Sequence, residues 1–428
     1  MLLEFQTENF KSFKDRIIFS MVPAPKQKGL DYSILNTKVG KKDYKALCSA
    51  VVYGPNAAGK TNILGAIQTF KSIVLRGNIK NSAPSSPNPS DYYLELIPNN
   101  TLKEKKNVFF SIKFIHNNYL INYSISLDLG LFMDKDYERT VLNEELEINE
   151  KKIFTRENNK LTFDNLKDIE TLLITNYEKK LKAIHTIVED SMQKEDLFLM
   201  NGFKTILSPA ITELISDYLT NKLEVAYHAD LMETVPQFNS KTAIDNFMNE
   251  AVKDFGINSN KLVYVKNKKT DEPILCSIMD DKRVLPAEMF ESYGTVRFVN
   301  IFPIISHALK YGGTLVIDEF DSSIHPMAIM SIIGVFHNDE INKNHAQLIF
   351  NTHNPLYLNG NLLRRDEIKF VERDDETKCS RHYSLSDFGT KGTNARKGKD
   401  YMDNYFISAY GAIRDIDFSD TFKKIVEE

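Results

Sequence analysis

The sequence of 428 residues predicts an α/β fold with an antiparallel β lobe and a helical insertion. The short apolar run Cys48–Tyr53 leads into a glycine-rich loop, after which Asn62–Phe70 carries apolar residues at helical spacing. Apolar and polar residues then alternate on both sides of Asn117-Asn118, as in a hairpin with one buried face. From about residue 166 to 255 this alternation gives way to apolar residues three and four positions apart, which is typical of helices.

The N-terminal lobe is expected to span residues 1–165. It begins with two strands, Leu2–Thr7 and Arg16–Met21. The hairpin comes after the glycine-rich loop. Its buried face is predicted to contain Val108, Phe110, Ile112 and Phe114 before the turn, and Tyr119, Ile121, Tyr123, Ile125 and Leu127 after it.

The helical insertion is expected to span residues 166–260, and the C-terminal lobe residues 261–428. Within the insertion, the apolar stripes consist of Ile184, Ile187 and Val188, followed by Ile211, Leu214, Ile215, Tyr218 and Leu219. These stripes are too short for long coiled-coil arms, so core packing is their expected role. The C-terminal lobe holds two short apolar strands that end in polar residues, within 314–319 and 347–354.

Composition excludes several classes of protein. The hydrophobic share of 42% and the charged share of 26% are ordinary for a globular chain, and the net charge of −4 gives no general attraction to nucleic acid or membranes. Cys48, Cys276 and Cys379 lie far apart without zinc-site spacing, so buried thiols in a reducing compartment are expected. Without a leader pattern or an apolar run long enough to span a bilayer, a cytoplasmic location is expected.

The glycine-rich loop Gly54–Thr61 matches G-x-x-x-x-G-K-[ST] at every defined position. Its backbone N–H groups and the positive end of the following helix are suited to bind phosphate. Lys60 is expected to reach the β- and γ-phosphates of ATP, and the Thr61 hydroxyl to ligate Mg²⁺. The residues predicted to bind nucleotide here are Asn56, Ala57, Ala58, Gly59, Lys60, Thr61 and Asn62.

Two later strand ends complete the predicted site. Asp318 and Glu319 follow an apolar strand; Asp318 is expected to hold Mg²⁺ through water, and Glu319 to polarise the attacking water. The alternative, that the two acids merely terminate a strand, is less favoured because of the phosphate loop. His353, at the end of the next apolar strand, is predicted to contact the γ-phosphate or that water.

Glu291–Arg297 precedes an apolar helix. Ser292 and Gly294 at the start of this helix predict a second anion cradle, by the same N–H and dipole reasoning. Many helices begin with serine and glycine nearby. The prediction therefore depends on the position of this segment, just before the strand that ends in Asp318 and Glu319.

The order of these motifs resembles that of ATP-binding-cassette (ABC) ATPase heads of the SMC, RecF and OLD (overcoming lysogenization defect) kind, an AAA-type group. The segments that carry the resemblance are Asn9–Phe13, Gly54–Asn62, the signature Glu291–Arg297, the Walker B strand Thr314–Glu319, the D-loop Asp321–Pro326 and the switch Asn351–His353. The strings ESYGTVRF, DEFDSSIHP and YFISAYGAI look like the ATPase partner of abortive-infection, PARIS-type phage-defence systems. No Q-loop glutamine is located, since Gln68 comes too early, and His325 is ambiguous between a helix cap and an interface residue.

The resemblance implies a homodimer or higher homo-oligomer in which each signature faces the ATP of the other head. It also implies a separately encoded effector, often nuclease-like, that the ATPase controls as a sensor or scaffold in antiphage defence. The alternative is a RecF- or SMC-like ATPase of DNA recombination or repair, so nucleic-acid binding stays open; a transporter ATPase fits poorly. The acids of Glu367–Glu376 are predicted to form a solvated strand end and turn rather than a nuclease site.

Overall fold

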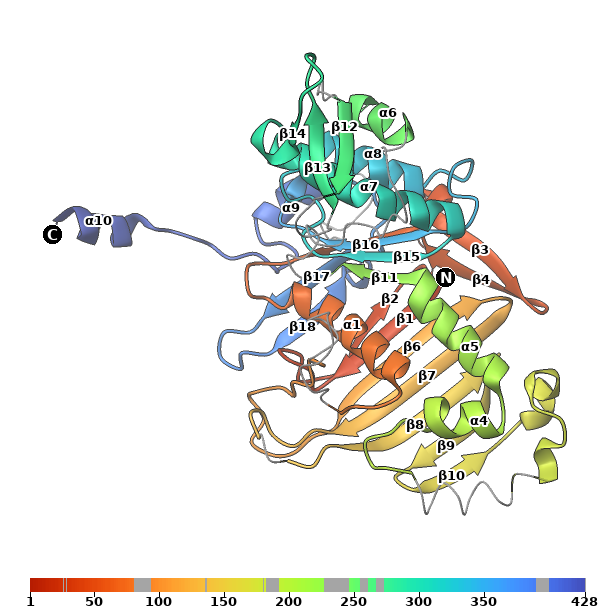
Figure 1. Cartoon of the computed structure of the whole chain (residues 1–428). Helices are drawn as coiled ribbons and strands as arrows, with labels where there is room; N and C mark the ends of the chain where they lie inside the picture. The colour runs from red at the N-terminus through yellow and green to blue at the C-terminus, as the bar shows by residue number, and fades with distance from the viewer. Residues whose placement is uncertain are drawn as a thin grey trace.

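The computed structural model describes residues 1–25, 27, 29–80, 94–134, 137–179, 181, 192–226, 246–254, 261–266, 273–389 and 400–427. Two large sheets enclose helix α1 (Lys60–Arg76), and helices α7 (Tyr293–Tyr311) and α8 (Pro326–Phe336) cover the opposite face of one of them (Figure 1). One apolar core joins α1 to both sheets, and a second lies under α7 and α8. This α/β architecture with an antiparallel lobe confirms the predicted fold class.

The first sheet has six strands in the order β11-β15-β16-β5-β17-β18. All neighbouring pairs are parallel except the edge strand β18, which is antiparallel to β17. The bounds are β5 Ser49–Tyr53, β11 Leu223–Ala226, β15 Thr314–Ile317, β16 Gln347–Asn351, β17 Ile368–Arg373 and β18 Ser380–Ser384. Strands β5, β15 and β16 are buried along their whole length, as expected for parallel strands covered on both faces. Because they are neighbours, their carboxyl ends meet at one edge.

The second sheet has seven antiparallel strands in the order β10-β9-β8-β7-β6-β1-β2. Strands β6 and β7 form the predicted hairpin, and both turn residues, Asn117 and Asn118, have positive φ angles. The two strands expected at the start of the chain are also confirmed, as β1 and β2. The bounds are β1 Leu2–Glu8, β2 Ile17–Ser20, β6 Val108–His116, β7 Tyr119–Asp128, β8 Thr140–Ile148, β9 Lys151–Glu157 and β10 Lys160–Phe163.

The described part of segment 166–260 is mainly helical, and Ile184, Ile187 and Val188 lie outside it. Its helical elements are η2 Leu166–Leu172, η3 Leu199–Phe203, α4 Lys204–Ile206, α5 Pro209–Asp217, η4 Tyr218–Lys222 and α6 Asn246–Asp254. The sequence did not predict strand β11, whose four residues become extended by pairing in parallel with β15. The proposed boundaries at residues 165 and 260 stay a prediction.

The other elements lie around the two sheets. They are the hairpin β3 Ile34–Val39 and β4 Lys42–Leu47, the small sheet β12 Lys261–Lys266, β13 Pro273–Ile278 and β14 Val284–Pro286, the short helices η1 Asp31–Ser33, η6 Ala287–Met289, η7 Pro355–Tyr357 and η8 Leu385–Asp387, and helices α9 Tyr401–Phe406 and α10 Ser419–Glu427. Helix α10 stands well away from the body at the end of an extended segment (Figure 1). Among the described residues, no helix has the length and apolar character needed to cross a membrane.

Candidate nucleotide site

The predicted site residues converge where β5, β15 and β16 end. Strand β5 leads into the loop 54–59 and then into α1, β15 leads into Asp318 and Glu319, and β16 ends at Asn351, two residues before His353. The order β15-β16-β5 therefore places the two acids, the switch histidine and the phosphate loop at one edge of the sheet. The carboxyl edge of a parallel sheet is the usual position of a ligand site in α/β proteins.

Two serines from distant segments hold the phosphate loop. Gly59 has φ 106°, and a Cβ atom there would lie 2.6 Å from Ser12 Oγ and 2.7 Å from Ser380 Oγ. The Ser380 hydroxyl donates to the carbonyl of Ala58 at 2.5 Å, and the Asn62 amide donates to Ser12 Oγ at 2.7 Å. Glycine is thus needed at position 59 for its backbone angle as well as for the close approach of both hydroxyls.

Lys60 is only 6% exposed and points back across the loop. Its ammonium donates to the carbonyls of Gly54 at 2.8 Å and Pro55 at 3.1 Å, and to His353 Nε2 at 3.1 Å. Burial lowers the pKa of Lys60 to about 8, although the acids at the end of β15 favour the charged form. Burial and the nearby ammonium lower the pKa of His353, so a neutral imidazole accepts the hydrogen bond from Lys60.

The polar groups at the ends of β15 and β16 are connected to the start of α1. The Thr61 hydroxyl donates to Asp318 Oδ1 at 3.2 Å, and the side-chain amide of Asn351 donates to the same oxygen. The amide oxygen of Asn351 accepts from the backbone N–H of Glu319 at 2.5 Å. Asn351 therefore positions both acids, a role that no local pattern in the sequence indicated, although the residue belongs to the predicted switch.

Glu319 has an unusual backbone conformation for a residue other than glycine, with φ 46°. Its N–H is held by Asn351, and its carbonyl accepts from the Arg297 guanidinium at 2.6 Å. A sparsely populated backbone conformation of this kind persists only when neighbouring groups hold it, and it is common at functional sites. Arg297 belongs to the predicted signature, so the signature helix is linked to the proposed catalytic acid of its own chain.

The signature begins as the sequence predicted, at the N-terminus of α7, where Ser292 is exposed. Ser292 is the N-cap of α7, and its exposed side chain accepts from the Thr295 N–H at 3.1 Å. A Cβ atom on Gly294 would lie 2.3 Å from the carbonyl oxygen of Ser323 in the D-loop. Glycine is thus required for contact with the D-loop, while the hydroxyl of Ser292 stays at the surface.

The geometry fits a nucleoside triphosphate with Mg²⁺. Helix α1 begins after Gly59 with no side-chain cap and no acid in its first turn, so its N–H groups suit an anion. The ammonium of Lys60, held among loop carbonyls, is next to this helix start. Thr61 and Asp318 supply the oxygen ligands that Mg²⁺ prefers, and bound Mg²⁺ would neutralise phosphate charge.

Several other residues have structural roles. His325 caps α8 through Nδ1, which accepts from the Met327 N–H at 3.2 Å. Of the acids in Glu367–Glu376, which were expected to be solvated, Glu367 is instead fully buried and accepts hydrogen bonds from Ser49 and the backbone of Arg364. At the solvated end of the segment, Asp374 accepts from the Thr377 N–H at 2.7 Å, and Asp375 pairs with Arg414 at 2.5 Å. No group of three or more His, Cys, Asp or Glu side chains among the described residues is arranged to hold a metal ion.

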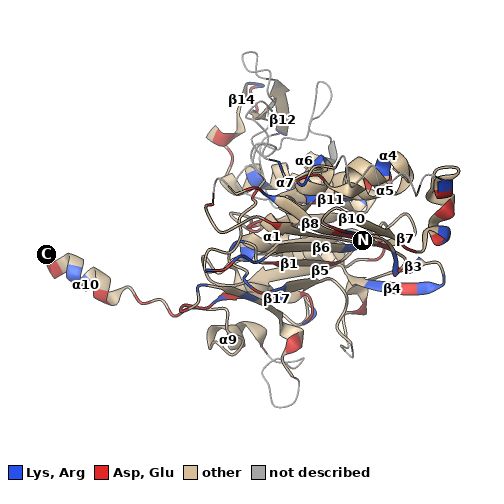
Figure 2. Ribbon diagram, turned by 90° about the horizontal axis from the view of Figure 1, so that it is seen from below, with Lys and Arg blue, Asp and Glu red and all other residues tan. Residues whose placement is uncertain are grey.

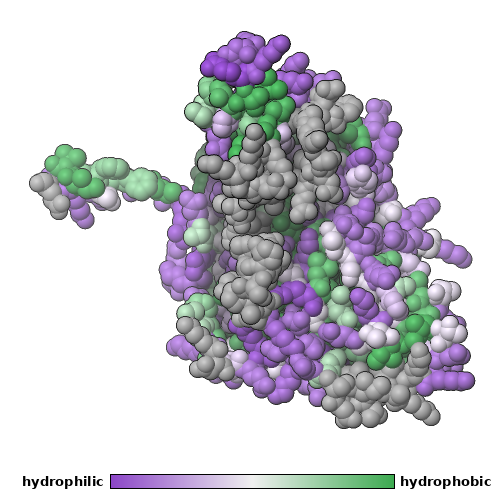
Figure 3. All heavy atoms as spheres, in the orientation of Figure 1, coloured by the Kyte–Doolittle hydropathy of each residue, from purple (hydrophilic) through white to green (hydrophobic). Residues whose placement is uncertain are grey.

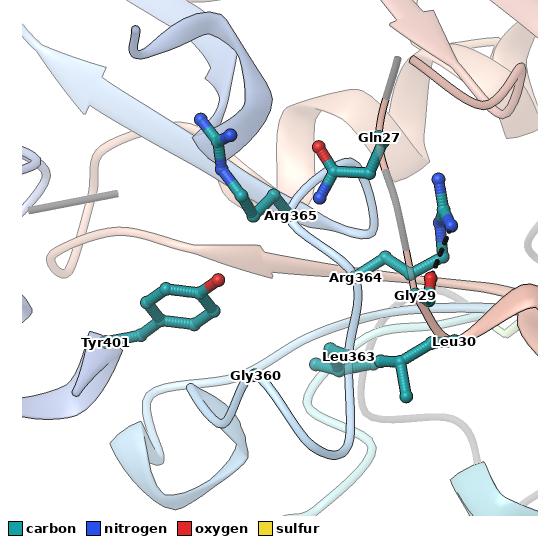
Figure 4. Close-up of a pocket in the computed structure, with 8 residues that line it drawn as sticks. All are labelled: Gln27, Gly29, Leu30, Gly360, Leu363, Arg364, Arg365 and Tyr401. Carbon is teal, nitrogen blue, oxygen red and sulfur yellow. Dashed lines mark hydrogen bonds between the residues drawn. The ribbon is translucent and has the colours of Figure 1, made fainter. Parts of the chain in front are cut away.

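A small cavity lies at the opposite edge of the parallel sheet, near the amino end of β17 (Figure 4). Its volume of about 10 Å³ suits roughly one water molecule. Arg364 closes one side, since its guanidinium pairs with Asp366 and donates to the Gly29 carbonyl at 2.7 Å. The cavity is too small for a nucleotide. Its lining residues are Gln27, Gly29, Leu30, Gly360, Leu363, Arg364, Arg365 and Tyr401.

Comparison with known families agrees with the strand-end geometry. The family model described as "AAA domain, putative AbiEii toxin, Type IV TA system" matches residues 49–359, which include the phosphate loop, the signature, both acids and the switch histidine. The chain belongs to this family. In its parallel sheet, the phosphate loop, the two acids after β15 and the switch histidine share one edge.

The solved structures similar to this chain include heads of SMC proteins. An SMC head bound to the C-terminal winged-helix domain of ScpA has 12% identity and a TM-score of 0.44, with 90% of this chain and 97% of that chain covered. The SMC head domain from Thermotoga maritima has 13% identity and a TM-score of 0.38, with 90% and 98% covered. The Smc head with an extended coiled coil from the Pyrococcus furiosus complex has 13% identity and a TM-score of 0.36, with 90% and 97% covered. A search of curated proteins finds no match to the chain.

Proposed function

We propose that this chain binds and hydrolyses Mg·ATP, and that the ATP cycle switches a separately encoded effector in antiphage, abortive-infection defence. The observation that carries the ATPase proposal is the convergence of Lys60, the Thr61–Asp318 pair and His353 at the ends of three neighbouring strands. Phosphate binding requires the uncapped helix start and the ammonium. Hydrolysis requires an acid held near them, which is the role proposed for Glu319.

Each residue has a distinct proposed role. Lys60 leaves the carbonyls of its own loop and binds the β- and γ-phosphates, which satisfy its charge better than neutral carbonyls do. Thr61 and Asp318 hold Mg²⁺. Glu319 takes a proton from the attacking water, and neutral His353, released from Lys60, contacts the terminal phosphate.

The signature is proposed to complete the nucleotide site of a second copy. Ser292 is exposed at the N-terminus of α7, and Gly294 fixes that helix against its own D-loop. A helix N-terminus held in this way can present N–H groups to a phosphate on a facing copy. ATP would then join two heads, and hydrolysis would release them.

A mixing experiment tests this arrangement. Ser292→Arg places a bulky cation at the contact, so the variant should bind ATP but lose the ATP-driven contact between heads and lose turnover. Lys60→Ala should lose ATP binding. Mixing the two variants should restore part of the turnover, because one composite site keeps both an intact loop and an intact signature.

Thr162→Arg, an exposed change on the far edge strand β10, is the matched control. Full activity of Ser292→Arg alone would contradict the composite site.

The defence role is supported by the family description, which names a toxin of a type IV toxin–antitoxin system. A separate effector is proposed because Asp374 and Asp375 are engaged in a turn and an ion pair rather than gathered for metal chemistry. Plaquing efficiency should fall only when the chain and its neighbouring gene are expressed together, and Lys60→Ala should abolish that protection. Toxicity of the chain alone, unaffected by Lys60→Ala, would contradict a controlling role.

A DNA-repair ATPase is less well supported. Basic and acidic residues are interspersed in the view of Figure 2, including the projecting β3–β4 hairpin. In that hairpin Lys38 pairs with Asp43 at 3.7 Å, and Lys42 pairs with Glu150 in the turn between β8 and β9. Duplex DNA that stimulated turnover and bound with a steep dependence on salt would favour this alternative instead.

A further inference from the structure

The last part of the chain carries an unusual concentration of exposed apolar side chains. Seven of the 22 exposed large apolar side chains among the described residues lie between positions 406 and 426, and each of the seven is at least 58% exposed. They form two groups: Phe406 and Ile407 at the end of α9, and Ile416, Phe418, Phe422, Ile425 and Val426 in and before α10. We call the first group the base patch, and residues 415–427 the arm.

The arm is fixed at its root and makes no core contact beyond it. The Tyr383 hydroxyl donates to the Tyr410 carbonyl at 2.7 Å, and Arg414 pairs with Asp375 at 2.5 Å. Beyond Arg414 the chain leaves the body, and none of the residues in α10 is buried (Figure 1). Asp415–Phe418 and the nine residues of α10 together reach roughly 25–30 Å from this anchor.

Helix α10 has an apolar side that needs a partner. Phe418, Phe422, Ile425 and Val426 follow the spacing of one helix face, and the rings of Phe418 and Phe422 lie 6.4 Å apart. The exposed apolar character of the arm is visible in Figure 3. Since isolated helices shorter than about 12 residues are marginal in water, a nine-residue helix with this face gains stability only against another surface.

We propose that the arm docks on the base patch of a second copy of this chain, and that the second copy's arm docks in return. The chain itself carries both an unpartnered apolar helix and an unpartnered apolar patch beside the root of the arm, which suits a reciprocal two-fold interface. Each of the seven side chains has roughly 100–150 Å² of exposed surface, so arm and base patch together could bury on the order of 700–1,000 Å² per copy. Stable protein interfaces bury about 800 Å² per partner.

The arm contact is distinct from the proposed ATP-dependent contact between heads, because it contains no residue of the nucleotide site. It would hold two copies together before ATP binds, and thus raise the effective concentration of each signature near the other phosphate loop. This consequence rests on the proposed function, whereas the arm exchange itself does not. The Lys60→Ala variant tests the arm exchange apart from the proposed ATPase function, since this change should block ATP binding and leave the arm contact intact.

Sedimentation of the full-length protein without nucleotide tests the exchange. Wild type and Lys60→Ala should form dimers at micromolar concentration. Phe422→Glu places a charge on the apolar face and should weaken self-association by about tenfold or more. Lys424→Glu, on the polar face of the same helix, changes charge by a larger amount and should associate as wild type does. Because these side chains lie outside every core, thermal unfolding and ATP binding should be unchanged in both variants.

A complementation experiment locates the docking surface. Ile407→Glu, at a base-patch residue that is 71% exposed, should weaken self-association as Phe422→Glu does. A mixture of the two variants should associate more strongly than either alone, because one intact arm meets one intact patch. The absence of this rescue would contradict docking on the base patch.

Three other results would overturn the proposal. A wild-type protein that is monomeric without nucleotide would mean that the arm folds onto its own chain or awaits a different protein. Equal association of Phe422→Glu and wild type would exclude the arm as the contact. A Phe422→Glu protein that keeps self-association but loses a co-purifying effector would assign the arm to that effector.

Discussion

The two ends of strand β5 carry similar residue types but have different surroundings. At the carboxyl end, Lys60, His353 and the acids at the end of β15 lie beside an uncapped helix start. At the amino end, Ser49, His337 and Glu367 also form a hydroxyl–histidine–acid cluster. The first cluster has donors suited to a phosphate, and the second has all its groups paired inside the core. A cluster of titratable side chains is therefore not by itself a site.

The amino-end cluster shows why such a group can be purely structural. The Ser49 hydroxyl donates to Glu367 Oε1 at 2.8 Å and lies 3.0 Å from His337 Nε2, which is itself 2.9 Å from the same carboxylate oxygen. The other oxygen of Glu367 accepts from the Arg364 N–H at 2.7 Å. Both contacts of His337 use a single ring nitrogen, so the relay of a hydrolase is absent, and the side chains are at most 3% exposed.

The largest expected effect on chemistry is at the carboxyl end. Glu319→Gln keeps the shape of the side chain and removes the proposed base, so turnover should fall by about 10²–10⁴ while ATP binding persists. Single-turnover hydrolysis and equilibrium nucleotide binding measure the two effects separately. Wild-type turnover in Glu319→Gln would remove the catalytic assignment and weaken the contrast between the two ends of β5.

The largest expected effect on stability is at the amino end. Glu367→Ala leaves the Ser49 hydroxyl, the His337 ring and the Arg364 N–H without their acceptor, so the free energy of unfolding should fall by about 2–4 kcal/mol. Urea unfolding measures this loss. ATP affinity of the folded protein should change by less than about twofold, because the cluster lies at the opposite sheet edge. If Glu367→Ala strongly weakened ATP binding and left the free energy of unfolding unchanged, the amino-end cluster would have a functional role rather than a structural one.

ATP binding at the carboxyl end of β5 is expected to depend on pH through Lys60. Burial lowers the pKa of Lys60 to about 8, so the free protein loses the ammonium as pH rises above 8. Phosphate oxygens favour the charged form, so affinity should fall by about tenfold between pH 7 and pH 9, with proton uptake on binding at the higher pH. Calorimetry in two buffers of different ionisation enthalpy measures that uptake. Lys60→Arg keeps its charge and should not show this dependence.

The same pKa shift also affects folding. The unfolded chain keeps its Lys60 proton up to the ordinary lysine pKa of about 10.4, so between pH 8 and that value it binds more protons than the folded chain does. The contribution of Lys60 to stability therefore rises with pH across this window, and below pH 8 the cost of burying the ammonium is fully present. Lys60→Met should remove this contribution from a series of unfolding measurements.

The smallest expected effect concerns the support of the phosphate loop. Ser380→Ala removes the hydroxyl that donates to the Ala58 carbonyl, so KM for ATP should rise by about two- to tenfold with little change in kcat. Ser386→Ala, a nearby hydroxyl in the turn after β18, is the control. An unchanged KM would show that Ser12 and the backbone are sufficient to hold the loop.

Local sequence patterns predicted much of the candidate site. The glycine loop, the strand that ends in two acids and the strand that leads to His353 each carry their own signal, because apolar runs and turn residues mark the strand ends. Local patterns indicated no role for three residues that the structure places in contact with the site: Asn351, Arg297 and Ser380. Each acts through a contact with a residue at least 22 positions away, and no local pattern reports such a contact.

The sequence by itself predicted several central strands of both sheets, the phosphate loop and an AAA-type, abortive-infection-related family, because these depend on periodicity and on residue types at fixed spacing. The narrower OLD or PARIS-type assignment stays a prediction. Only the tertiary structure decided the strand order β15-β16-β5, the addition of β11 to the edge and the contact between Lys60 and His353. It also distinguished the two polar clusters of β5, because the amino-end cluster is buried in the core while the carboxyl-end cluster lies beside a helix start without a side-chain cap. Those properties arise when distant segments pack together, and the order of residues along the chain does not encode them locally.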